Sequence, residues 1–261
     1  MAIITLTTDL GTKDSYLASV KGSIYSQLDD ARIVDITNDI TAFNIPQAAF
    51  VLRNCYKDFP VGSIHIVSID DELSIENEHL VVKANGHYFI GTDNGLFSLL
   101  LNEMKAEKII QLNIVQESNC LTFATKNIFA SAACHLARGG TMEMIGTIVN
   151  DYLVHRTDLK AVKEKDLIKG VIVYNDNYGN AITNIDKAMF LDIQKGRDFI
   201  IYYGREDEKI TIISEKYNDV PPGDKLAIFG ENEQLQIAMN KGTANTLLGL
   251  KLHEIIRIEF R

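Results

Sequence analysis

The first 140 residues alternate short apolar runs with amphipathic helical patterns, and this alternation restricts the possible folds more than any other feature of the chain. Strands are predicted at 3–8, 32–36, 63–69, 79–84, 87–91 and 107–112. Helices are predicted at 14–28, 45–56, 94–104 and 127–138. Such alternation favours an α/β fold in which helices cover a mostly parallel sheet.

The last 90 residues have a different pattern, in which short strand-like runs are broken by turn residues. Strands are predicted near 169–175, 198–203, 209–213 and 225–229. Before them, the stretch 158–168 is charged and poor in core residues, which indicates a linker. We therefore expect an α/β domain at 1–157 and a smaller, β-rich, barrel-like domain at 169–261.

A carboxylate directly follows the first predicted strand. This strand ends in Thr-Asp-Leu-Gly at 8–11, and a helical pattern through Val20, Ile24 and Leu28 comes next. Open α/β sheets bind ligands at the carboxyl ends of their strands. Asp9 has two acceptor oxygens at that place, so it can accept hydrogen bonds from both hydroxyls of a diol.

The segment 176–185 concentrates polar groups around an aromatic ring. Gly179 permits backbone conformations that other residues resist. Asp176 and Asn180 can then offer acceptors and donors on the two sides of the Tyr178 ring. This combination suits a heterocycle with polar edges. The same residue types are also typical of a plain turn at the end of a strand, and the segment alone does not decide between the two.

Several motifs occur along the chain in one order. They are Thr-Asp-Leu-Gly at 8–11 with Asp14 and Tyr16, Asp-Ile-Thr at 35–37, Asp-Asn-Gly-Leu at 93–96, Tyr-Gly-Asn at 178–180 and Thr-Asn-Ile at 183–185. With these motifs in this order, the chain resembles the S-adenosylmethionine hydroxide adenosyltransferases, whose relatives include the chlorinase and fluorinase enzymes. The motifs span nearly all of the chain.

The resemblance implies a two-domain subunit and a homotrimer whose active sites lie between the first domain of one subunit and the second domain of its neighbour. It also implies a small-molecule substrate: a nucleophile attacks the ribose C5′ of S-adenosylmethionine, and methionine leaves. Because the sulfonium is already an activated leaving group, no metal or organic cofactor is expected. The chain lacks the long insertion that marks the fluorinase and chlorinase relatives, so halogenation is not expected.

The family's hydrolases hold water with a triad of Asp, Arg and His, and two of the three positions differ here. Asp70 fills the aspartate position, whereas Asn77 falls where the arginine belongs and Ala124 replaces the histidine. Alanine cannot exchange a proton and asparagine carries no charge, so water activation by the family's route is incomplete. We therefore expect slow hydrolysis to adenosine and methionine. A rate typical of the family would instead indicate that another residue positions the water, with Lys126 and Glu76 as the first candidates. The alternative is a non-catalytic nucleoside or S-adenosylmethionine binding protein or sensor.

The resemblance assigns substrate contacts to other positions. Tyr178 is expected to stack on adenine, and Asn180 to bind its polar edge. Phe43 lies where the halogenases place an aromatic residue near the ribose, although a core Phe before a helix is an equally good interpretation. Asp176 completes the polar group around Tyr178.

Three further positions have weaker assignments. Asn94 follows a predicted strand, so it is either a ligand contact or a turn residue. Glu231 replaces a serine of the family and can pair with the ammonium group of methionine. Thr125 lies where a small polar residue contacts halide in the halogenases.

Composition excludes several classes of protein. The chain has 261 residues, 46% of them hydrophobic, and a net charge of -9, which argues against nucleic acid as a partner. It contains no apolar run long enough for a membrane span and no signal-peptide pattern, so no membrane partner is expected. Neither the three cysteines, at 55, 120 and 134, nor the histidines have the spacing of metal ligands. The small, odd number of cysteines indicates a reducing cytoplasm. We expect Cys55 and Cys134 to be core residues, and His65 and His135 to be structural.

Overall fold

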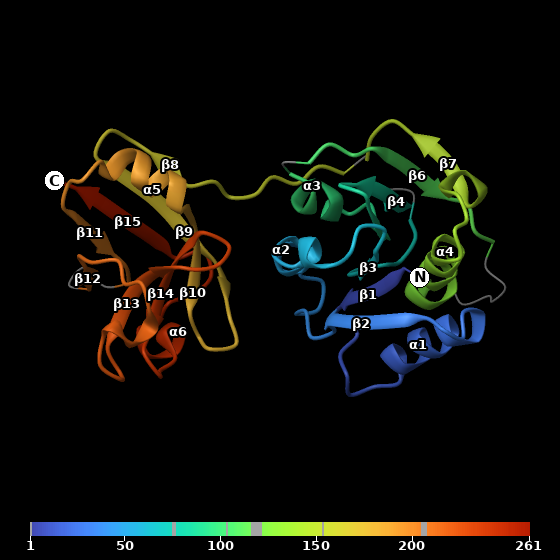
Figure 1. Ribbon diagram of the computed structural model, residues 1–261, viewed down its shortest axis with the longest axis horizontal. Helices are drawn as coiled ribbons and strands as arrows, with labels where there is room; N and C mark the ends of the chain where they lie inside the picture. The colour runs from blue at the N-terminus through green and yellow to red at the C-terminus, as the bar shows by residue number, and fades with distance from the viewer. Residues whose placement is uncertain (1, 75–76, 103, 116–121, 153, 205–207) are drawn as a thin grey trace. The chain divides into compact units, whose positions relative to one another are not determined.

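The computed structural model describes residues 2–74, 77–102, 104–115, 122–152, 154–204 and 208–261. The chain forms two compact units, Met1–Thr157 and Asp158–Arg261 (Figure 1). The first unit is α/β with a mixed, mostly parallel sheet, and the second is built on an antiparallel, barrel-like sheet. The predicted fold class is therefore confirmed.

The first unit contains a seven-stranded sheet in the order β2-β1-β3-β5-β4-β6-β7. Its strands are β1 (Ile3–Thr8), β2 (Arg32–Thr37), β3 (Ile64–Ser68), β4 (His79–Ala84), β5 (His87–Thr92), β6 (Lys108–Leu112) and β7 (Gly146–Val149). The neighbours β2, β1, β3 and β5 run parallel to one another, and antiparallel pairing begins at β4. The carboxyl ends of four strands therefore meet along one edge.

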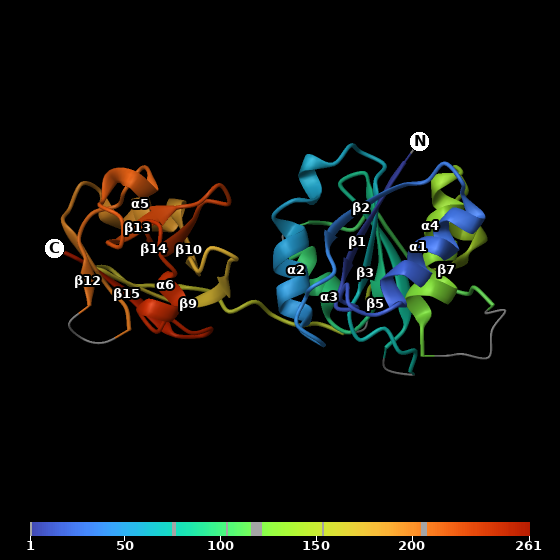
Figure 2. The same ribbon diagram turned by 90° about the horizontal axis from the view of Figure 1, so that it is seen from below.

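Helices cover both faces of this sheet. They are α1 (Tyr16–Gln27), α2 (Ile45–Arg53), α3 (Leu96–Leu100) and α4 (Ala130–Ala137), with the short turns η1 (Tyr56–Asp58) and η3 (Met142–Met144) and a π-helical segment, η2 (Thr125–Phe129), that leads into α4. Helices α1 and α4 pack on one face, and α2 and α3 on the other (Figure 2). Because β2 and β3 lie on opposite sides of β1, the connections diverge there, and such a switch point is where open α/β sheets bind ligands.

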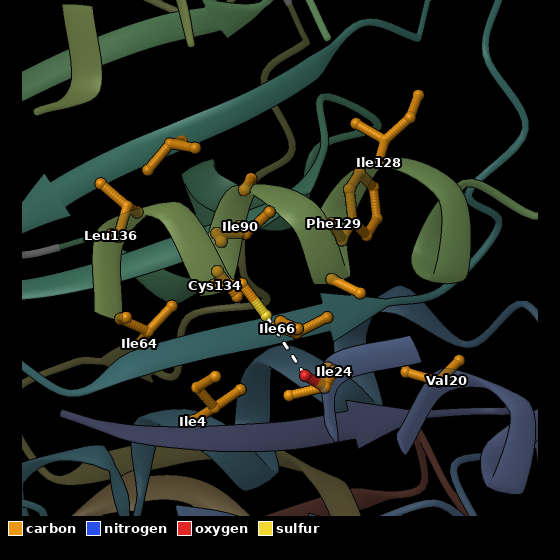
Figure 3. Packing of buried hydrophobic residues seen from close by; sticks show 14 of the residues in the cluster. Ile4, Val20, Ile24, Ile64, Ile66, Ile90, Ile128, Phe129, Cys134 and Leu136 are labelled. Carbon is orange, nitrogen blue, oxygen red and sulfur yellow. Dashed lines mark hydrogen bonds between the residues drawn. The ribbon is translucent and has the colours of Figure 1, made fainter. Parts of the chain in front are cut away.

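The core under α1 and α4 explains why these segments fold as they do. Ile4 of β1 and Ile64 and Ile66 of β3 are fully buried against the two helices (Figure 3). Cys134 lies in this core, and its thiol donates a hydrogen bond to the Ile24 carbonyl at 3.8 Å (Figure 3). It is thus the small core residue that the sequence predicts. Cys55 is only partly buried, and position 120 lies outside the described residues.

The second unit consists of short antiparallel strands in the order β12-β11-β15-β9-β10-β14-β13, with β8 added on β9. The strands are β8 (Val162–Lys163), β9 (Leu167–Asn175), β10 (Ala181–Asp186), β11 (Phe199–Tyr202), β12 (Lys209–Ile210), β13 (Lys225–Phe229), β14 (Gln234–Met239) and β15 (Ile255–Phe260). Helices α5 (Lys187–Gln194) and α6 (Ala244–Leu247) and the turn η4 (Tyr217–Asp219) complete it. The stretch 158–168 that we predict as a linker contains β8, which pairs with β9, and the first residues of β9.

In the part of the chain that the structure describes, no helix has the length and apolar character needed to cross a membrane.

Candidate functional site

The loop after β1 presents Asp9 at the carboxyl edge of the sheet. Thr8 Oγ1 donates to Asn38 Oδ1 at 2.8 Å, and the Gly11 N–H donates to the Asn38 carbonyl at 2.7 Å. Asn38, which follows β2, is buried, so the loops after β1 and β2 hold each other in place. Asp9 therefore projects from a fixed backbone, in the place that the sequence predicts for a ligand-binding carboxylate.

Asp9 also organises the chain before α2. Its Oδ2 accepts a hydrogen bond from the Phe43 N–H at 2.9 Å. Phe43 has a φ of 64°, a left-handed conformation that its N–H bond and the following N-cap, Asn44, help to maintain. The Phe43 side chain is 72% exposed, so the alternative of a core Phe is wrong. An exposed ring on a residue whose backbone N–H bonds the Asp9 carboxylate is suitable for packing against a sugar or a cation.

Asp70, the retained triad position, follows β3 and is exposed. It has a φ of 51°, and Asn94 Nδ2 donates to the carbonyls of Ile69 and Asp70 at 2.8 and 3.4 Å. Asn94 Oδ1 accepts from the Leu96 N–H at 3.3 Å, so the Asn94 side chain bonds the backbone on both sides. These contacts fit the turn interpretation of Asn94, and its contact with a ligand stays a prediction.

Asp71, which the sequence reasoning missed, makes more contacts than its neighbour. Its Oδ2 accepts hydrogen bonds from the Thr125 N–H at 2.8 Å, from the Thr125 hydroxyl, and from Ser68 Oγ at 3.2 Å. The hydroxyls of Ser68 and Thr125 also contact each other. His79 Nε2 donates to the Asp71 carbonyl at 2.9 Å, which fixes the backbone of the same residue. Two consecutive aspartates at a strand end were the available signal.

The three carboxylates at this edge interact. Burial raises the pKa of Asp9, the Phe43 N–H opposes that rise, and the charges of Asp71 and Asp70 add to it. The pKa effect of both neighbours shows that Asp70 and Asp71 lie within electrostatic range of Asp9. The edge therefore has a negative potential, which favours cationic ligands over anionic ones.

The two substituted triad positions have different surroundings. Ala124 is fully buried in the core under α1 and α4, immediately before η2. Asn77 is partly buried, and its N–H donates to Ser74 Oγ at 3.0 Å. Lys126 is partly buried at the start of η2, whereas Glu76 lies outside the described residues. Neither Asn77 nor Ala124 adds a charge near Asp70.

In the second unit, the segment between β9 and β10 forms a tight turn around Asp176. Asp176 Oδ1 accepts from the N–H groups of Tyr178 and Asn180 at 2.9 and 2.8 Å, and Oδ2 accepts from Asn180 Nδ2 at 2.8 Å. Asn180 is buried, but the Tyr178 side chain is 76% exposed. Asp176 and Asn180 thus form the turn that the second interpretation predicts. This turn holds the backbone of Tyr178 in place while its ring is exposed. Stacking of that ring on adenine stays a prediction.

Gly179 is required by this turn. Its φ is +81°, and a Cβ at this position would lie 2.7 Å from Asn245 Oδ1 and 2.9 Å from Thr243 Cα. Its carbonyl accepts from the Asn245 N–H at 2.8 Å. The turn is therefore packed against the start of α6, and a side chain at 179 would separate the two.

Further polar residues lie near the Asp176 turn. The Tyr217 hydroxyl donates to Gln236 Oε1 at 3.3 Å, and Gln236 is buried. Burial, and next the charge of Asp176, raise the pKa of Tyr217, which places the two side chains in proximity. Glu231 is exposed in the turn between β13 and β14. No sequence motif indicated Tyr217 or Gln236.

The histidines of the first unit are structural where their contacts are described. His65 Nδ1 bonds Thr5 Oγ1 at 2.8 Å, and its Nε2 bonds His87 Nδ1 at 3.1 Å. His135 Nε2 donates to the Thr141 carbonyl at 2.9 Å. Among the described residues, no three His, Cys, Asp or Glu side chains are grouped so as to hold a metal ion.

Comparison with known proteins covers both units. Residues 4–146 match the model of the SAM hydroxide adenosyltransferase N-terminal domain, and residues 170–257 match that of its C-terminal domain. An (R)-S-adenosyl-L-methionine hydrolase of Methanocaldococcus jannaschii is 32% identical over 71% of this chain and 67% of its own length. A protein with the same name from Thermus thermophilus is 27% identical over 93% of this chain and 94% of its own. The crystal structure of an uncharacterized conserved protein from Thermotoga maritima superposes with a TM-score of 0.89 at 28% identity, covering 98% of this chain and 99% of the other.

Proposed function

Because the chain belongs to the SAM hydroxide adenosyltransferase family, we propose that it hydrolyses S-adenosylmethionine to adenosine and methionine. The observation that carries the proposal is the family match across both units, which includes the residues that form the Asp9 loop and the Asp176 turn. The relatives named as hydrolases support the reaction type.

We propose that each unit takes part in binding. Asp9 accepts the ribose hydroxyls beside the exposed Phe43 ring, and the negative edge attracts the cationic sulfonium. Tyr178 stacks on adenine, Asn180 bonds its edge, and Glu231 attracts the ammonium group of methionine. The substrate then needs no cofactor, because the C5′–S bond is already activated by the positive charge on sulfur.

In the reaction, a water oxygen attacks C5′ while the C5′–S bond breaks. The bonding electron pair moves to sulfur, which leaves as the neutral thioether of methionine, and the water gives up a proton. Positioning and removal of solvation supply much of the rate in such a step. With Asn77 and Ala124 at two triad positions, we propose that turnover is slow.

The assembly that the family resemblance implies is part of this proposal. Asp9 and Tyr178 belong to different units of the chain. We propose that Asp9 of one subunit and Tyr178 of a neighbour bind the same nucleoside in a homotrimer.

Chromatography of the products tests the proposed function. Purified protein incubated with S-adenosylmethionine should release adenosine and methionine in equal amounts, slowly but above the spontaneous rate. The variant Tyr178→Ala is the control for contaminating enzymes, since it should lose the activity while its exposed position leaves the fold intact. Tight binding of S-adenosylmethionine without release of adenosine would contradict hydrolysis and favour the binding protein or sensor.

A further inference from the structure

The loop after β3 places a carboxylate where Thr125 presents two donors. The backbone N–H of Thr125, at 2.8 Å, and its hydroxyl both donate to one oxygen of Asp71, and Ser68 Oγ donates to the same oxygen at 3.2 Å. Thr125 is fully buried and Ser68 nearly so, whereas Asp71 is partly exposed. Three donors from two separate segments thus converge on a single negatively charged atom.

Convergent N–H and O–H donors of this kind are what a small anion requires for binding. Here that position is taken by a charge that belongs to the chain itself. Asp9 and Asp70 add further negative charge at this edge, where the charges of Asp71 and Asp70 both act on Asp9. A free halide would therefore meet an occupied position and a repulsive field. A neutral water, in contrast, can donate a hydrogen bond to a carboxylate.

We propose that Asp71 determines the nucleophile of this site by excluding anions and accepting water. The inference rests on the proposed function for its catalytic meaning, because the excluded anion would be the competing nucleophile at C5′. In the hydrolytic step, the water oxygen forms the bond to C5′, the C5′–S electron pair goes to sulfur, and the water proton passes to the acidic edge and then to solvent. With a halide in place of water, the same bond would break and no proton would be released.

Bromide binding tests this role without S-adenosylmethionine. Line broadening of the bromide NMR signal is measured against bromide concentration for the unmodified protein, Asp71→Ala and Glu72→Ala. Glu72→Ala is the matched control, since it removes the same charge from the next, exposed residue. We expect Asp71→Ala to bind bromide at least about tenfold more tightly than the other two proteins, because it loses the nearest repulsive charge and exposes the Thr125 donors.

Equal bromide binding by the folded Asp71→Ala and Glu72→Ala variants would overturn the inference. If Asp71→Ala does not fold by circular dichroism, Asp71→Asn serves instead, since the amide keeps the shape and an acceptor while it removes the charge. For Asp71→Asn we expect bromide to bind about threefold more tightly than to the unmodified protein. An unchanged bromide affinity of this variant would also overturn the inference. If the unmodified protein releases no adenosine but Asp71→Ala gains bromide binding, the proposed function fails and the assignment of the anion-excluding residue stands.

Discussion

At the scale of single residues, Asp9 has two uses for one carboxylate. It accepts the Phe43 N–H and thereby fixes the chain before α2, and it faces the edge where we propose that a ribose binds. Burial raises its pKa, while the N–H bond favours the ionised form that a diol needs. A substitution at Asp9 must therefore be designed to separate the local bond from the ligand bond.

We expect Asp9→Ala to weaken adenosine binding by roughly 1–3 kcal/mol, because two charged hydrogen bonds to the ribose are lost. Asp9→Asn keeps an acceptor for the Phe43 N–H and should recover part of the affinity. Asp30→Ala removes the same charge beyond the other end of α1 and should have no effect. Calorimetry with adenosine measures all three, and an unchanged affinity for Asp9→Ala would refute the ribose assignment.

The sequence predicted the position of Asp9, because a carboxylate that directly follows a parallel strand lies at the carboxyl edge of the sheet in an α/β fold. The two consecutive aspartates at 70 and 71 were a signal, but they do not indicate the hydrogen-bond partner of Asp71, because Thr125 is 54 residues away. The exposure of Phe43 could not be predicted from the sequence either, because it depends on a left-handed backbone conformation that no local sequence pattern indicates.

At the scale of elements, the turn between β9 and β10 is the best-defined support for a ligand contact. Three hydrogen bonds to Asp176 and the close approach of Gly179 to α6 fix the backbone under Tyr178. The rigidity of this turn lowers the entropy that an aromatic ring would lose on stacking.

Gly179→Ala should lower the free energy of unfolding by about 1–2 kcal/mol, and it should also weaken adenosine binding, because the new Cβ displaces the turn from α6. Gly196→Ala is the matched control. Gly196 has a φ of +80°, but no atom lies within 4 Å of its added Cβ. Gly196→Ala should lower the free energy of unfolding but leave adenosine binding unchanged. Equal adenosine affinity of the two variants would show that the turn does not support the ligand contact.

Two buried histidines, His65 of β3 and His87 of its neighbour β5, make the stability of the fold depend on pH. Burial, and next the charge of His87, lower the pKa of His65 to about 3, and burial lowers the pKa of His87 as well. The unfolded chain binds protons near the ordinary pKa of about 6.5, whereas the folded chain resists them. Stability is therefore present above pH 6.5 and is lost progressively as the pH falls from there toward 3.

Because of His65, we expect the free energy of unfolding to fall by roughly 1–2 kcal/mol between pH 6.5 and pH 5. Urea unfolding at a series of pH values measures this slope. His65→Gln keeps donor and acceptor groups for Thr5 and His87 but does not titrate, so its slope should be shallower. The same slope in both proteins would mean that other groups cause the acid sensitivity.

The elements that the sequence predicted are those with long apolar runs. β1 and β4 have the predicted bounds, and β2, β3, β5 and β6 differ by a residue or two. Strands that are buried on both faces, such as β3, show continuous hydrophobicity in the sequence. β10 escaped prediction, since Thr183 is a buried polar residue whose hydroxyl bonds the Leu235 carbonyl across the sheet. The short helix α5 escaped as well, because its start depends on the Asp186 side chain, which caps the Met189 N–H at 2.6 Å.

At the scale of the whole molecule, the proposed reaction uses groups from two units of different construction. The α/β unit supplies the acidic edge with Asp9, and the barrel-like unit supplies Tyr178 on its turn. Under the proposed trimer, these groups meet only between neighbouring subunits.

A mixing experiment tests that arrangement. Asp9→Ala and Tyr178→Ala should each be nearly inactive as homotrimers. If they are unfolded and refolded together at equal amounts, about one quarter of the sites should combine an intact Asp9 with an intact Tyr178, and activity should return. Sedimentation should show a species of three chains. A monomer that binds adenosine at full strength, or mixed protein without recovered activity, would refute the shared site.

The most direct test of the central claim is hydrolysis of S-adenosylmethionine in water enriched in ¹⁸O, followed by mass spectrometry of the adenosine. If water attacks C5′, the product carries the heavy isotope in its 5′-hydroxyl group, and methionine carries none. The unmodified protein should give this labelled adenosine at a slow rate, and Tyr178→Ala should not. Adenosine without the label, or no adenosine beyond the spontaneous amount, would contradict the assignment of this protein as a hydrolase.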